Sequence, residues 1–135
     1  MDEVRNGLDF VCDGGVLFGV DVCCFDRDPA FVTAVRFRFA LCPVAFYAVA
    51  DDDTITAACG DELSCDDGPW VEVSDQPVWS ACVGCHAAWA WLLINQQGYR
   101  DGIRIEFEAK DRSESRIVEL VVLASAFRFY VTREL

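Results

Sequence analysis

Ile103-Arg104-Ile105-Glu106-Phe107-Glu108 is the stretch that decides the fold, because apolar and charged residues alternate along its whole length. Alternation with a period of two is typical of a β-strand that buries one face and exposes the other to water. We therefore expect a half-buried strand here, and we use it as the starting point for the segments on either side.

Other segments on both sides carry similar strand patterns, and they are separated by runs of Gly, Pro, Asp and Ser that are typical of turns. The expected strands cover residues 16–25, 35–41, 44–49, 54–56, 117–124 and 127–132. Many short strands with few helical patterns predict a mainly β or β-rich α+β fold, an antiparallel meander forming a sandwich or a partly open barrel. At most one or two short helices are expected, near the N-terminus or around residues 77–81. Residues 1–135 are predicted to form a single globular domain.

Residues 86–94, just before the opening stretch, are rich in Ala, Leu and Trp and are harder to interpret. We favour a strand in which Trp89, Trp91 and Leu93 share one face. Apolar residues on both faces of that strand predict a central position in a sheet. A buried helix over residues 81–94 is the alternative, because short apolar runs do not distinguish the two structures.

The charge is strongly negative and unevenly placed. The net charge is −12, and residues 39–99 contain nine acidic residues and no Lys or Arg. Nucleic acid and anionic membrane surfaces are poor partners for such a chain, because Lys and Arg make the contacts to phosphate and lipid headgroups. A basic protein is the partner that this charge favours.

The candidate partner-binding residues are the acidic residues of this middle segment together with an aromatic and a cationic residue that follow it. Tyr and Arg are types favoured at binding hot spots. The candidates are Asp51, Asp52, Asp53, Asp61, Glu62, Asp66, Asp67, Tyr99 and Arg100. A tight hairpin connection whose Tyr packs inward is the alternative for residues 95–102, where Gly98 and Gly102 suit a positive φ.

The segment Trp91-Leu92-Leu93-Ile94-Asn95-Gln96-Gln97-Gly98-Tyr99-Arg100-Asp101-Gly102 has the pattern W-x-L-x-N-x-x-G-Y-x-D-G, and Asp52-Asp53-Thr54 precedes it. Over residues 50–130 the chain resembles a small bacterial family of domains of unknown function that carries these elements. The resemblance implies a small β-rich domain and brings no catalytic residues.

The N-terminal residues are acidic and no apolar segment follows them, so we expect no secretory signal and a cytoplasmic protein. The longest apolar run, residues 39–50, is 12 residues long and contains Pro43. A membrane-spanning helix needs about 20 apolar residues. In a reducing cytoplasm, the eight cysteines are expected to be thiols or metal ligands rather than disulfides.

Cysteine spacing offers one candidate metal site. Cys82-Val83-Gly84-Cys85-His86 matches the haem attachment pattern literally, but neither an export signal nor a second axial Met accompanies it. A zinc site is the better inorganic interpretation, because four thiolates satisfy tetrahedral zinc. Its ligands would be Cys59, Cys65, Cys82 and Cys85. We expect no cofactor, with zinc as the alternative.

Catalysis has little support in the sequence. His86 is the only histidine, and in a strand it points away from the adjacent Cys85. We therefore name no catalytic residue and no specific biochemical function. The leading hypothesis is a non-catalytic acidic protein-binding module, similar in its logic to an immunity or inhibitor protein, with a basic partner. A zinc-stabilised structural domain and a small hydrolase that uses acidic loops are the alternatives.

Overall fold

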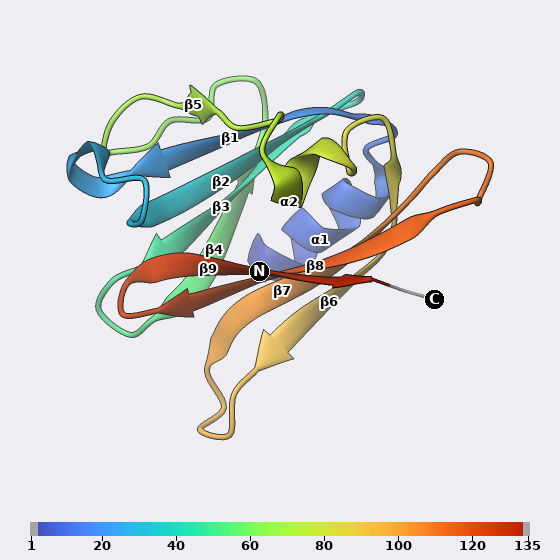
Figure 1. The fold of residues 1–135 in the computed structure, drawn as a ribbon. Coiled ribbons are helices and arrows are strands. Elements are labelled where there is room, and N and C mark those ends of the chain that lie inside the picture. Colours follow the sequence, from blue (N-terminus) through green and yellow to red (C-terminus); the bar gives the residue numbers. More distant parts are fainter. Residues whose placement is uncertain (1–2, 134–135) are drawn as a thin grey trace.

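Two antiparallel β-sheets with a helix packed between them make up the protein (Figure 1). The computed structural model describes residues 3–133. The first sheet has the order β4-β3-β2-β1-β5 and the second the order β6-β7-β8-β9. The predicted mainly β fold is confirmed, in the form of an open sandwich rather than a closed barrel.

The first sheet is built from β1 (Leu17–Cys24), β2 (Val32–Phe39), β3 (Pro43–Val49), β4 (Thr54–Cys59) and β5 (Val71–Glu72). The second is built from β6 (His86–Ile94), β7 (Arg100–Glu108), β8 (Ser115–Leu123) and β9 (Ala126–Arg133). The helices are α1 (Glu3–Asp13), the short 3-10 turn η1 (Phe25–Arg27) and α2 (Pro77–Ser80). Both expected helix positions are therefore occupied.

Helix α1 fills the space between the sheets, where it contacts β3, β4 and β6. Its buried residues Val4, Leu8 and Val11 recur at helical spacing and so form one apolar face. Gly7 lies on the same face, and a Cβ there would come within 2.8 Å of the Ala57 Cβ on β4. The absence of a side chain at Gly7 thus lets the helix approach the sheet closely.

Aromatic rings join the two sheets in the core. Phe37 on β2 lies 5.5 Å from Trp79 and 6.2 Å from Phe107 on β7, measured between ring centroids. It also packs edge-on against Phe46 at 6.0 Å. Phe37 alternates with Arg36 and with Arg38 along β2, so the pattern that buries the ring directs both guanidinium groups to the outer face of the sheet.

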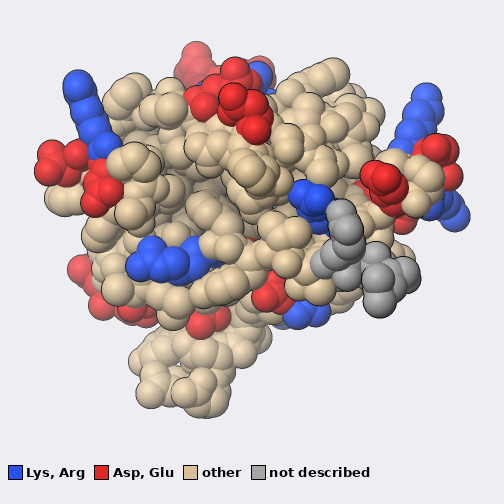
Figure 2. Space-filling view, viewed as in Figure 1, with Lys and Arg blue, Asp and Glu red and all other residues tan. Residues whose placement is uncertain are grey.

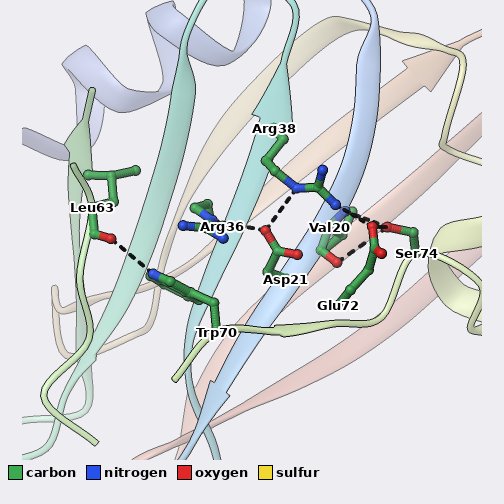
Figure 3. A network of polar contacts seen from close by, with 8 residues as sticks. All are labelled: Val20, Asp21, Arg36, Arg38, Leu63, Trp70, Glu72 and Ser74. Atoms are coloured by element: carbon green, nitrogen blue, oxygen red, sulfur yellow. Dashed lines mark hydrogen bonds and ion pairs between the residues drawn. The ribbon is translucent and has the colours of Figure 1, made fainter. Parts of the chain in front are cut away.

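The outer face of the first sheet carries a buried carboxylate (Figure 3). Asp21 on β1 is 4% exposed, and its Oδ2 accepts hydrogen bonds from Arg36 Nε and Arg38 Nε, each at 2.9 Å. Arg38 also forms an ion pair with Glu72 on β5, which accepts a hydrogen bond from the Ser74 hydroxyl at 3.1 Å. The network ties the edge strand β5 to β1, its neighbour, and to β2.

The charges of this network reinforce one another. The hydrogen bond from Ser74, followed by the interactions with Arg38, lowers the pKa of Glu72 below its ordinary value. Partial burial opposes the charge on Arg38, but Asp21 and Glu72 outweigh it and raise the Arg38 pKa. Both shifts favour the charged forms that the Arg38–Glu72 ion pair requires.

The segment between β4 and α2 crosses this outer face and covers it. Trp70 lies under the Arg36 guanidinium, and the distance between its ring centroid and Arg36 Cζ is 4.7 Å. Its indole N–H donates to the Leu63 carbonyl at 3.0 Å. The Tyr47 hydroxyl donates to the Ser64 carbonyl at 2.8 Å. A disulfide between Cys23 and Cys65 fastens the same segment to β1.

Two expectations about the strands are wrong. Strand β6 has the predicted bounds, but it lies at the edge of its sheet rather than in the centre, so its apolar outer face is exposed. Gly102 is not at a positive φ; it lies within β7, where a Cβ would come within 2.4 Å of the Leu120 carbonyl oxygen. Its role is close strand packing, not a turn.

We predict that Asp21→Ala lowers the free energy of unfolding by about 2 kcal/mol, measured by urea denaturation. Removing one partner of a buried ion pair costs about 3–5 kcal/mol, and the partial exposure of both arginines reduces this. Asp75→Ala, an exposed acid with no ion pair among the described residues, is the control and should change the free energy of unfolding by less than about 0.5 kcal/mol. Equal losses for the two variants would contradict the role given to Asp21.

Candidate functional site

The hairpin formed by β6 and β7 projects from the sandwich, and Figure 2 shows its tip as an uncharged projection at the bottom of the view. Asn95 organises the turn: its backbone N–H donates to the Tyr99 carbonyl at 3.0 Å. Its side-chain oxygen accepts from the backbone N–H of Gln97 at 2.9 Å and of Tyr99 at 3.2 Å. Gly98 adopts the predicted positive φ of 85°. The turn thus presents Tyr99 in a defined position.

Four large apolar side chains on this one hairpin are exposed: Trp89, Trp91, Ile94 and Tyr99. We call them the hairpin surface. Trp89 is 63% exposed and lies opposite Glu106 on β7, and Trp91 lies opposite Arg104, whose Cζ is 6.0 Å from the ring centroid. Several exposed apolar groups gathered on one hairpin mark interaction sites more often than single scattered ones do.

Tyr99 and Arg100, two predicted binding residues, lie in an open cleft of about 390 Å³ between the hairpin, α1 and β4. Thr54 and Thr56 form the opposite wall, and the Thr56 hydroxyl donates to the Glu3 carboxylate at 2.9 Å. Because Thr54 directly follows the acidic turn, the structure brings Tyr99 and Arg100 close to one end of that turn.

The acidic turn, Asp51 to Asp53, connects β3 and β4. Asp52 Oδ1 accepts hydrogen bonds from Thr54, and Asp53 Oδ1 accepts from the Ser125 backbone N–H at 2.8 Å, which links the turn to the β8–β9 hairpin. Neither donor is a cation, and among residues 3–133 no Lys or Arg forms an ion pair with these carboxylates. The turn is therefore ordered but still negatively charged.

The other predicted acidic residues lie on the segment that follows β4, and they do not join the acidic turn in one patch. Figure 2 shows acidic side chains in separate groups around this face. Within residues 3–133, none of the acidic candidates has an ion pair with Lys or Arg. The residues of the second set are Asp61, Glu62, Asp66 and Asp67.

Comparison with protein families identifies the chain. Residues 10–135 match a family of unknown function, DUF6334. The chain belongs to this family. The expected relationship to a domain of unknown function is thus confirmed, while the comparisons with curated proteins and with solved structures found no match.

The four cysteines predicted as zinc ligands in this DUF6334 domain lie in three places. Cys65 is in the disulfide with Cys23, Cys59 lies beside Cys42 near the end of β4, and Cys82 and Cys85 flank the turn before β6. In the part of the chain that the structure describes, no three His, Cys, Asp or Glu side chains are grouped to hold a metal ion. The expectation that all cysteines are thiols or metal ligands is wrong for Cys23 and Cys65, because the covering segment brings Cys65 onto β1.

The Cys82-x-x-Cys85 thiols are held in neutral form. Burial raises the pKa of Cys82 to about 12, and partial burial, followed by the charge of Glu114, raises the pKa of Cys85. Each thiol donates to a carbonyl four residues earlier, Cys82 to Val78 at 3.7 Å and Cys85 to Ala81 at 3.4 Å. This environment disfavours the thiolate that nucleophilic or redox chemistry requires.

No helix among residues 3–133 of this DUF6334 domain has the length and hydrophobicity needed to span a membrane. Trp89 and Trp91 were not among the candidate residues predicted from the sequence, although a signal for their exposure was present. The alternation of residues 103–108 places Arg104 and Glu106 on the water side, and a short connection pairs them with the two tryptophans. Residues opposite solvated charges share the exposed face.

We predict that Cys82 of the native domain reacts with iodoacetamide at pH 8 at least roughly a hundredfold more slowly than in urea, since it is buried and its thiolate is scarce. Mass spectrometry of peptides from the alkylated, unreduced protein measures the rate. Cys85, which is half-buried, serves as the neighbouring control and should react faster. Equal rates for Cys82 in native and unfolded protein would contradict this assignment.

Proposed function

We propose that the chain is a non-catalytic protein-binding module that uses the hairpin surface to bind a basic, arginine-rich segment of a partner protein. The observation that carries this proposal is the concentration of Trp89, Trp91, Ile94 and Tyr99 as exposed side chains on one hairpin. Trp and Tyr are the residue types that most often dominate binding energy at interfaces.

The chemistry of the hairpin surface favours a cationic partner. A guanidinium group over an indole face gains about 0.5–1 kcal/mol at an exposed site and more when water is excluded. Arg104 already approaches Trp91 in this way. Trp89 has no ring contact or cation among the described residues, so its faces are open to a partner's arginine.

The charge of the chain supports the same partner. The net charge is −12, and the acidic candidates from Asp51 to Asp67 have no neutralising base among the described residues. Because Asp51 to Asp53 precede β4 and the other acidic candidates follow its far end, they support long-range attraction of a basic protein more than a single contact site. An immunity-like or inhibitor-like role is one that such a module would serve, and nothing in the described residues favours the zinc or hydrolase alternative.

Two synthetic peptides, an oligoarginine and an oligolysine of the same length, test the proposal by isothermal titration calorimetry. The unmodified chain should bind oligoarginine more tightly, because guanidinium groups stack on indole rings better than ammonium groups do. Trp89→Ala should weaken oligoarginine binding roughly fivefold, which corresponds to about 1 kcal/mol, and should reduce the preference for arginine.

Phe18→Ala is the matched control, because Phe18 is also 63% exposed but lies on β1, away from the hairpin. It should leave both affinities unchanged. Asp51→Asn/Asp52→Asn should weaken both peptides equally, and added salt should do the same. Equal affinity for the two peptides, or the same loss in Trp89→Ala and Phe18→Ala, would contradict the proposal.

A further inference from the structure

A second candidate site lies between the sheets, apart from the hairpin surface. A cavity of about 450 Å³ opens where β1 ends and β2 begins, and the segment around β5 forms one wall. Val22, Val32, Val73 and Phe129 contribute apolar side chains to it. Pockets that enclose small molecules have volumes of roughly 300–1,000 Å³ and mostly apolar walls. The cavity has the size and lining of such a pocket.

Trp79 gives the cavity an unused hydrogen-bond donor. The side chain is 1% exposed and lines the cavity, and within residues 3–133 its indole N–H has no acceptor. Every fully enclosed side-chain nitrogen or oxygen in the described part of the chain does have a partner. The indole nitrogen therefore belongs to the small exposed part of Trp79, and because this residue lines the cavity, its N–H can reach a ligand there.

The remaining polar groups in the lining define which ligand would fit. Arg27 is the one charged residue that lines the cavity, and it has no ion pair among the described residues. Gln76 adds an amide at the same opening. Arg and Trp side chains donate hydrogen bonds and do not accept them. A ligand must therefore bring an acceptor, and the positive charge of Arg27 favours an anionic one.

We propose that this cavity binds a small amphipathic carboxylate, with its apolar body against Val22, Val32 and Phe129 and its carboxylate near Arg27 and Trp79. The proposal is independent of the protein-binding function, because none of the residues of the hairpin surface lines the cavity. A protein of this kind would carry or sense an apolar acid.

Decanoate is the probe, with decanol and decylamine as neutral and cationic analogues, and binding is measured by calorimetry and by the NMR signal of the Trp79 indole N–H. Decanoate should bind more tightly than both analogues and shift the Trp79 signal more than those of the other three tryptophans. Arg27→Gln should weaken decanoate roughly fivefold and leave decanol unchanged, because an exposed charge contributes about 1 kcal/mol.

Arg128→Gln is the matched control: it removes the same charge from β9 at a residue outside the cavity, and decanoate affinity should not change. Val71→Phe adds a ring at an exposed position of the cavity wall and should block all three probes. The proposal is overturned if decanoate does not bind, if decanol or decylamine binds equally well, or if Arg27→Gln and Arg128→Gln have the same effect.

Discussion

The ion pairs of the buried Asp21 carboxylate with Arg36 and Arg38 are the interaction on which the outer face of the first sheet depends. A charge at this depth is stable only because Arg36 and Arg38 both donate to it, and Arg38 extends the network to Glu72. Glu72 belongs to β5. The residues on either side of Glu72 in the sequence, Val71 and Val73, form a wall of the apolar cavity. The ion pairs on the outer face therefore help to shape a pocket on the inner face.

The two sheets differ in how their outer faces are treated. The segment between β4 and α2 covers the outer face of the first sheet, and the Asp21 network and the Cys23–Cys65 disulfide hold it there. The Trp70 and Tyr47 rings therefore pack against each other. No described element covers the second, and Trp89 and Trp91 remain in water. Exposing two indole rings on an edge strand favours association, which a domain without a binding role would be expected to avoid. This contrast is the physical basis for the proposal that the second sheet carries a binding surface.

The sequence predicted the strands well because burial on one face leaves a period of two, as residues 103–108 show. It did not distinguish an edge strand from a central one, since apolar residues on both faces of β6 occur in either case. The disulfide was also beyond prediction: 42 residues separate Cys23 from Cys65, and only the path of the covering segment joins them.

The candidate site was predicted in part. Tyr99 and Arg100 do lie together beside the strand that follows the acidic turn, because the short Asn95–Gly98 turn determines their position. The seven acidic candidates do not form one patch, since residues close in sequence are carried to separate places by β4 and the segment after it. Trp79 and Arg27, which line the same cavity, are far apart in the sequence and share no pattern that would predict this.

Chemical-shift mapping of the backbone and indole N–H groups during titration with an oligoarginine peptide tests the central claim most directly. We predict the largest changes at the indole N–H groups of Trp89 and Trp91 and at the backbone of Tyr99. Changes at Trp70 should be small, because this side chain is half-buried and its indole N–H already donates to the Leu63 carbonyl. Largest changes on the outer face of the first sheet, or changes spread evenly over all acidic groups, would contradict it.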